Sequence, residues 1–233
     1  IPRTTNETLF TQSPGFDPSV VDVPQVMEGM KGQAAKNVAE YDLAKRRLID
    51  SELTEKSIDF MRRNANGDAP FFLYVPLTHL HFPTLPHPDF AGKSGVGEFA
   101  DSMMEMDHRV GQLIDAVKNL GIYEDTLFIF ASDNGPEFRR PWRGTAGPWS
   151  GTYHTAMEGG LRVPLIVRWP GQIEKATESD DIIHVTDLFS TLIEAAGANL
   201  PSDRPIDGVS QMNWWTGRTE NSAREGFLFY IKS

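Results

Sequence analysis

The sequence contains no cysteine, so neither disulfides nor thiol chemistry is available within its 233 residues. Basic side chains are outnumbered, with 22 Lys and Arg against 32 Asp and Glu and a formal net charge of −10. No stripe of lysine and arginine is present, which argues against nucleic acid as a partner. Long apolar runs are also missing: the run PFFLYVPL at 70–77 is far too short to span a bilayer.

A secretory signal is another missing feature, because residues 1–20 lack a charged segment followed by an apolar one. The first residue is isoleucine rather than methionine, so we expect the chain to be a processed or truncated piece, and the compartment stays unknown. What is present is 39% hydrophobic and 10% aromatic composition, enough for one large core or most of one.

Apolar strands and amphipathic helices alternate along the chain. Residues 1–35 are rich in proline, glycine and polar residues and are expected to be irregular. Predicted helices cover 36–64, 98–120 and 182–196, and predicted strands cover 70–77, 125–132, 162–170 and 225–232. In the helix 98–120, residues such as Phe99, Met103, Leu113 and Val117 are expected to form the buried stripe. Continuous apolar strands between helices predict an α/β fold with a mostly parallel sheet and helices on both faces.

Polar side chains follow two of these strands directly. The segment FIFASDNGPEF at 128–138 places Asp133 and Asn134 after one strand, and THLHFP places His79 and His81 after another. Ligands of open α/β sheets bind beyond the carboxyl ends of the strands. Asp and Asn oxygens suit Ca²⁺ or Mg²⁺, and imidazoles can bind an anion or pass a proton. The alternatives are an ordinary Asn-Gly turn and histidines that only satisfy local structure.

Four segments in order resemble the sulfatase family, in the arylsulfatase branch of the alkaline phosphatase superfamily. They are PFFLYVPLTHLHFPTLP, FADSMMEMDHRVGQLIDAVKNLGIYEDTLFIFASDNGPE, YHTAMEGGLRVPLIVRWPG and IIHVTDLFSTLIEAAG. The resemblance implies that Asp133 and Asn134 are Ca²⁺ ligands, together with two aspartates of an earlier strand. It implies that His81 contacts the sulfate group as a catalytic and substrate-binding residue, and that His79 lies near the same pocket as a further substrate-binding residue.

Two departures from the family pattern shape the expectations. The nucleophile of the family is a formylglycine made within C/S-x-P-x-R, and no such motif occurs here, so we expect it in a missing N-terminal part. Many members also carry a lysine shortly before EGG that binds sulfate, whereas this chain has Tyr153 and His154 there. We expect His154 to replace that lysine in catalysis and substrate binding; the alternative is that it only packs in its loop. An imidazole carries positive charge only when protonated.

The resemblance therefore predicts part of a sulfatase catalytic domain over 1–233: 1–35 irregular, 36–224 the α/β core and 225–233 the start of a smaller C-terminal domain. The predicted function is hydrolysis of a small-molecule or carbohydrate sulfate ester, with the chain inactive by itself. The alternatives are a phosphodiesterase or phosphonate hydrolase of the same superfamily, and a non-catalytic ligand-binding fragment. A periplasmic or secreted location is expected from the family, and self-association through exposed apolar edges is expected from truncation.

Overall fold

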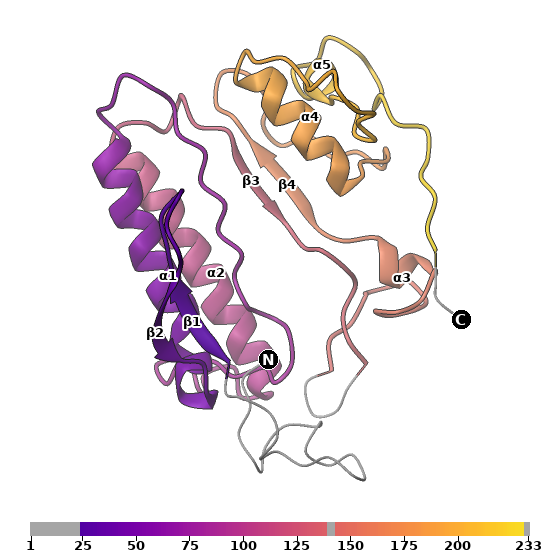
Figure 1. The fold of residues 1–233 in the computed structure, drawn as a ribbon. Coiled ribbons are helices and arrows are strands. Elements are labelled where there is room, and N and C mark those ends of the chain that lie inside the picture. The colour runs from indigo at the N-terminus through magenta and orange to yellow at the C-terminus, as the bar shows by residue number, and fades with distance from the viewer. Residues whose placement is uncertain (1–23, 139–142, 231–233) are drawn as a thin grey trace. The chain divides into compact units, whose positions relative to one another are not determined.

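The computed structural model describes residues 24–138 and 143–230. Its elements, in chain order (Figure 1), are β1 (Gln25–Glu28), β2 (Lys36–Glu40), α1 (Leu43–Asn64), α2 (Glu98–Asn119), β3 (Phe128–Ala131), α3 (Glu158–Leu161), β4 (Leu165–Arg168), α4 (Val185–Ala195) and α5 (Met212–Trp215). They divide into two compact units. Of the described residues, the N-terminal unit comprises 24–64, 72–116, 137–138 and 143–144, and the C-terminal unit comprises 65–71, 117–136 and 145–230.

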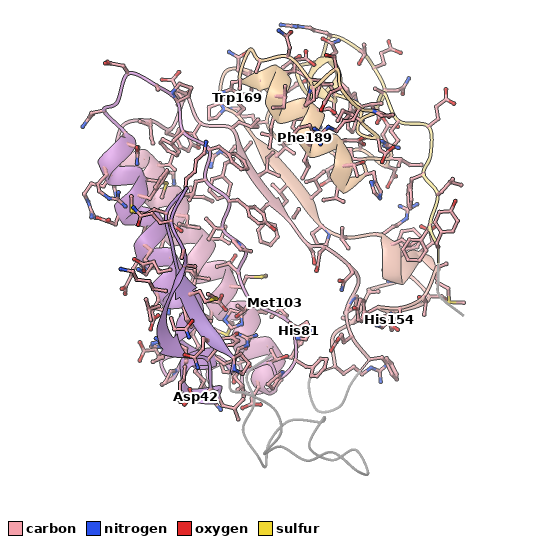
Figure 2. The ribbon with its side chains drawn as sticks, viewed as in Figure 1. Asp42, His81, Met103, His154, Trp169 and Phe189 are labelled. Atoms are coloured by element: carbon pink, nitrogen blue, oxygen red, sulfur yellow. The ribbon has the colours of Figure 1, made fainter. Side chains whose placement is uncertain are left out.

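The N-terminal unit begins with an antiparallel hairpin, in which β1 pairs with β2 from Gln25↔Glu40 to Glu28↔Lys36. The predictions of irregular structure up to residue 35 and of a helix from residue 36 are therefore wrong over these two strands. The helix begins only at Leu43, because Asp42 caps it: its Oδ1 accepts a hydrogen bond from the backbone N of Lys45 at 2.7 Å. Figure 2 labels Asp42 at this end of α1.

The helices predicted at 98–120 and 182–196 are confirmed as α2 and α4, and both end as their glycines predict. Gly121 has φ +73° and donates to Lys118 O, while the following N–H of Ile122 reaches Val117 O. The same pair of bonds closes α4 at Gly197, with φ +68°. This double closure needs a residue in the left-handed conformation, which glycine adopts without steric cost.

The strands predicted at 125–132 and 162–170 are present as β3 and β4, but they pair antiparallel, with Phe128 opposite Arg168 and Ala131 opposite Leu165. The expectation that they run parallel is wrong. A parallel pair needs a crossover of a dozen or more residues, usually a helix, whereas antiparallel strands need only a return of the chain. In the described part of the segment that connects β3 to β4, the helix present is α3, which is only four residues long. Residues of β4 alternate between half-buried and exposed.

The predicted strands at 70–77 and 225–232 form no ladder among the described residues. Exposure nevertheless alternates along 71–77, and Phe72 and Tyr74 are 71% and 76% exposed. This is the pattern of a strand whose apolar side chains lack a covering partner. An apolar sequence typical of a strand is therefore not sufficient to form one, because a strand also needs backbone hydrogen bonds to a neighbouring strand.

A buried carboxylate organises the end of the C-terminal unit. Asp187 is fully buried at the start of α4 and accepts hydrogen bonds from the backbone N of His184 and of Val209, each at 2.9 Å. Arg224 adds Nε and Nη2 bonds at 2.7 and 2.6 Å. Burial raises the pKa of Asp187, but the hydrogen bonds from Arg224 and the two amides outweigh it and hold the pKa below its usual value.

None of the described helices is both long enough and apolar enough to cross a membrane.

Candidate functional site

His81 is an exposed residue between the half-buried residues 78–80 and the buried residues 82–86 of a loop in the N-terminal unit (labelled in Figure 2). The side chain of His79 is 1% exposed, and Phe82 and Thr84 on the other side are 6% and 0% exposed. The His81 ring stacks on Phe82, with centroids 4.8 Å apart and planes inclined by 21°. Its Nδ1 lies 2.6 Å from the carbonyl oxygen of Phe82. A carbonyl only accepts, so Nδ1 carries a proton and Nε2 is the atom left to meet a ligand.

The turn from Thr78 to His81 is fastened to α1 by one ion pair. Asp50, 1% exposed, accepts from the backbone N of Thr78 at 2.7 Å and from its Oγ1 at 2.6 Å. Arg46, 2% exposed, donates from Nη2 to the carbonyls of Thr78 at 2.9 Å and of His81 at 3.1 Å. Its Nη1 contacts the Thr78 hydroxyl. Both ends of the turn are thus bound to one guanidinium group.

The same turn is fastened to α2 through His79. Its Nε2 lies 3.0 Å from Glu105 Oε2 and 3.2 Å from Asp50 Oδ2. Glu105 is fully buried, accepts from the backbone N of His87 at 2.7 Å and pairs with Arg109 at 3.1 Å. We call these five side chains, Arg46, Asp50, His79, Glu105 and Arg109, the buried ion network. It links two helices and the loop that carries His81.

The charge of Glu105 is stabilised within this network. Burial by itself raises the pKa of its carboxyl group. Hydrogen bonds from His79 and from the His87 amide, with the interaction with Arg109, act in the opposite direction and prevail, so the pKa lies below its usual value. Glu105 is therefore an ionised, fully paired carboxylate at neutral pH.

The C-terminal unit carries the other predicted residues, first at the end of β3. Asp133 is exposed and Asn134 is half-buried. The Nδ2 of Asn134 donates a hydrogen bond to the carbonyl oxygen of Gly135 at 2.9 Å. This bond uses the nitrogen of the Asn134 amide and does not use its oxygen. Two hard oxygen donors, one of them charged, therefore follow the strand, as the sequence predicts.

Glycines bring this segment against the EGG segment. A Cβ on Gly135 would lie 2.0 Å from the carbonyl oxygen of Gly159 and 2.8 Å from the Cα of Gly160. The backbone N of Gly135 donates to Gly160 O at 3.0 Å. Gly159 and Gly160 in turn leave no room for a Cβ against the carbonyls of Gly151 and Thr152. We call this close backbone packing of 135, 151–152 and 159–160 the glycine contact.

His154 is placed beside the glycine contact. The backbone N of Tyr153 donates to Pro136 O at 3.0 Å, which binds the 153–154 segment to the residues that follow Asn134. His154 is exposed, with φ +64°, and its ring centroid lies 3.9 Å from that of Tyr153. Figure 2 labels it on this loop. Asp133, Asn134 and His154 thus belong to segments that are joined by backbone hydrogen bonds within one unit.

The predicted residues fall into the two units: His79 and His81 in the N-terminal unit, Asp133, Asn134 and His154 in the C-terminal unit. The expectation that they share one cleft stays a prediction. Among the described residues no three His, Asp or Glu side chains gather in a way that could hold a metal ion. Sequence reasoning missed Arg46, Asp50, Glu105 and Arg109, although both helices carry opposite charges four residues apart, as in a buried or exposed ion pair.

Comparison with known proteins shows which proteins this chain resembles in structure and in sequence. A solved sulfatase from Pseudoalteromonas sp., PsFucS1, superposes with a TM-score of 0.80 at 30% identity, covering 85% of this chain and 40% of that one. The predicted α/β fold of the alkaline phosphatase and sulfatase type is thereby confirmed. The chain is 37% identical to rat steryl-sulfatase over 189 residues, or 78% of its own length and 32% of the relative. It is 40% identical to human arylsulfatase A over 173 residues, or 74% and 34%.

A family model for sulfatases matches residues 4–198, so the chain belongs to the sulfatase family. It spans about a third of the length of these two curated relatives. Sulfatases generally use a metal ion.

Proposed function

We propose that this chain is the part of a sulfatase catalytic domain that contributes one half of a divalent-cation site and a sulfate-binding histidine, and that the whole protein hydrolyses a sulfuric ester. In this proposal residues 36–224 form the α/β core and 225–233 begin a smaller C-terminal domain. The observation that carries it is the presentation of His81: an exposed imidazole on a turn that buried ions hold in place. Membership of the sulfatase family supports the choice of sulfate as its ligand.

The geometry of His81 defines what it can do to a sulfate ester. Because Nδ1–H is committed to the Phe82 carbonyl, protons are gained and lost at Nε2. A protonated Nε2 donates a hydrogen bond to a sulfate oxygen or to the oxygen of the leaving alcohol. A neutral Nε2 accepts a proton instead. The stacked Phe82 ring limits rotation of the imidazole, so the donor keeps one direction.

The residues at the end of β3 offer the type of oxygen ligand that Ca²⁺ prefers, but fewer ligands than Ca²⁺ needs. The Asp133 carboxylate and the Asn134 amide oxygen are hard donors, and the amide oxygen is not used by the Asn134–Gly135 hydrogen bond. Calcium takes six to eight oxygens, more than these two side chains supply. A bound cation would withdraw charge from sulfate oxygens. We therefore expect weak Ca²⁺ binding by this chain, with further ligands supplied from outside it.

His154 is proposed as the cationic group that replaces a lysine near the sulfate. Its exposure and its place beside the residues that follow Asn134 support a role at the same site. When protonated, its imidazole donates to a sulfate oxygen. His79 is less suited to direct substrate contact, because its side chain is 1% exposed and its Nε2 already faces two carboxylates.

The proposal is tested by binding to the purified chain of p-nitrophenyl sulfate and p-nitrophenyl phosphate, followed through the side-chain NMR signals of the histidines. We expect the sulfate to shift the signals of His81 and His154, and His81→Ala to weaken its binding. His87→Gln, a histidine of the same loop that pairs with Asp89, is the control. Stronger binding of the phosphate would favour the alternative of a phosphate- or phosphonate-ester hydrolase.

Turnover gives a second test. Without a nucleophile motif the chain has no group to attack sulfur, so we expect no release of p-nitrophenol. Release that His81→Ala abolishes would contradict this expectation. If His81→Ala and Asp133→Ala both leave binding of sulfate and of Ca²⁺ unchanged, the assignment of the site is wrong.

Self-association is proposed from the exposed apolar side chains. Phe72, Tyr74, Leu228 and Tyr230 are between 71% and 83% exposed. Apolar side chains of this size favour contact with another surface. Analytical ultracentrifugation over a range of chain concentrations tests this, and a monomer at every concentration would contradict it.

A further inference from the structure

His79 is too buried to contact a sulfate ester directly, and its ring is already engaged by buried side chains. Its side chain is 1% exposed, and Nε2 faces the carboxylates of Asp50 and Glu105 at 3.2 and 3.0 Å. Both neighbours accept hydrogen bonds, so Nε2 carries a proton. The other nitrogen, Nδ1, is buried without a partner among the described residues. The ring is thus held from one side, by two helices at once.

We propose that His79 is a positioning residue for His81: by bridging Asp50 of α1 and Glu105 of α2, it fixes the turn on which His81 stands and thereby the ring nitrogen that His81 presents. This inference rests on the proposed sulfate-binding role of His81. It gives His79 a task within that site without any contact with the substrate.

Residues 79 and 81 belong to one turn, in which the backbone N of His81 donates to Thr78 O at 3.2 Å. Asp50 receives the Thr78 amide and hydroxyl and also faces His79. Arg46 binds the carbonyls of Thr78 and His81. The hydrogen bonds that hold the turn to α1 therefore come from Asp50, which faces His79, and from Arg46, which pairs with Asp50.

Two arginines and two carboxylates of the buried ion network cancel formally, and the bridge between the two pairs is the His79 N–H. Without His79, Asp50 would keep Arg46 and Thr78 as partners, and Glu105 would keep Arg109 and the His87 amide. Each buried carboxylate would lose one hydrogen bond, and the two pairs would no longer be linked through the turn.

The backbone of the turn also favours one tautomer of His81. The Nδ1–H of His81 donates to the carbonyl of Phe82, the next residue in the chain, at 2.6 Å. That bond depends on the backbone conformation between the two residues. A loosened turn releases Nδ1, and a free imidazole in water favours the proton on Nε2 instead. The nitrogen presented to a ligand would then change from lone pair to N–H in the neutral side chain.

The test reads the tautomer of His81 by ¹⁵N NMR of its ring in the purified 233-residue chain. We expect neutral His81 to carry its proton on Nδ1 in the parent protein. In His79→Leu we expect the Nδ1–H form to be lost in favour of Nε2–H. In His79→Gln, whose amide N–H can donate to the carboxylates in place of Nε2, we expect it to be retained. His108→Gln, an exposed histidine of α2, is the matched control and should change nothing.

A purely structural role would lower stability in His79→Leu without altering the tautomer of His81 in the folded protein. That result, or loss of the Nδ1–H form in His79→Gln as complete as in His79→Leu, would overturn the proposal. If His79→Leu does not fold, His79→Asn replaces it, because its shorter amide reaches one carboxylate at most. An unchanged tautomer in folded His79→Asn would likewise overturn it.

A titration with p-nitrophenyl sulfate separates this inference from the proposed function. If the tautomer responds to His79 as expected but the sulfate ester leaves His81 unperturbed, the proposed function fails and the positioning role stands. If the ester perturbs His81 equally in the parent and in folded His79→Leu, with no change in tautomer, the positioning role fails and the proposed function stands.

Discussion

The two units hold their candidate residues by different means. In the N-terminal unit, long charged side chains from two helices reach the turn of His81, and its carbonyls and amides are bound to Arg46 and Asp50. In the C-terminal unit, the segment of Asp133 and Asn134 is held by backbone against backbone, where Gly135 meets Gly159 and Gly160. One site depends on charge and the other on the absence of side chains.

The difference predicts different sensitivities. A network of buried ions is sensitive to loss of charge and to acid, because each unpaired partner remains desolvated. A close backbone contact is insensitive to charge but cannot accept one additional carbon atom. We therefore expect the turn of His81 to respond to loss of charge, and the segment of Asp133 and Asn134 to respond to one added carbon atom.

The largest effect is expected from Asp50→Ala. It leaves the buried Arg46 guanidinium without its carboxylate and the Thr78 amide without an acceptor, and His79 keeps only Glu105. Breaking a buried pair in this way costs about 3–5 kcal/mol. Chemical denaturation should show that loss in the free energy of unfolding of the N-terminal unit. The control is Glu52→Ala, which removes the partly exposed pair with Lys45 and should cost about 1 kcal/mol or less. Equal effects would contradict the importance of the network.

The next effect is expected from Gly135→Ala. The added Cβ would lie 2.0 Å from the Gly159 carbonyl oxygen, which is backbone and cannot turn away. Forcing apart such a contact costs about 1–3 kcal/mol, and the Tm should fall accordingly. Gly111→Ala is the matched control, since a Cβ on this glycine of α2 meets nothing within 4 Å. It should stabilise the protein by about 0.4–1 kcal/mol. Destabilisation by both would indicate a general intolerance of the chain.

Acid should weaken both units through their buried carboxylates. The pKa of Glu105 is lowered from 4.5 and that of Asp187 from 3.8 on folding. A lowered folded pKa means that the stabilisation is fully present above the unfolded value and is lost as pH falls through the folded one. Stability should therefore decline below about pH 4.5. Thermal melts between pH 7 and pH 3 measure this decline.

Variants assign that decline to a unit. Glu105→Gln should make the N-terminal unit less dependent on pH in this range, and Asp187→Asn should do the same for the C-terminal unit. The exposed Glu220→Gln is the control for a change of net charge alone. A pH profile that neither Glu105→Gln nor Asp187→Asn alters would show that other groups cause acid unfolding.

The smallest effect is expected from His154→Gly. Residue 154 has φ +64°, a left-handed conformation that glycine adopts without steric cost and in which a histidine is strained. Relief of this strain and the greater freedom of glycine in the unfolded chain oppose each other, so stability should change by less than about 1 kcal/mol. Binding of sulfate should nevertheless weaken if His154 is the proposed cationic group. A large loss of stability would assign His154 to packing of its loop instead.

The buried stripe of α2 illustrates how far the sequence could lead. Apolar periodicity predicts Met103 in the core, yet Met103 (labelled in Figure 2) is 44% exposed, while Glu105 is fully buried. Leu113 and Val117 are buried as expected. Hydrophobicity alone predicts the buried face of a helix correctly only where the neighbouring segments cover that face with apolar side chains. Here His79 and the His87 amide supply hydrogen bonds that make a buried carboxylate acceptable.

The sequence by itself determined the local features of this protein. Glycines at 121 and 197 ended two helices, Asp133 and Asn134 followed a strand, and His81 entered a loop, because each depends on residues within a few positions. The tertiary structure decided the rest. Partners 18 or more residues away decide the strand direction, the burial of Asp50 and Glu105, and the contact of Gly135 with Gly159. Local propensity cannot specify such partners, because they are selected by packing and by the need to pair every buried charge.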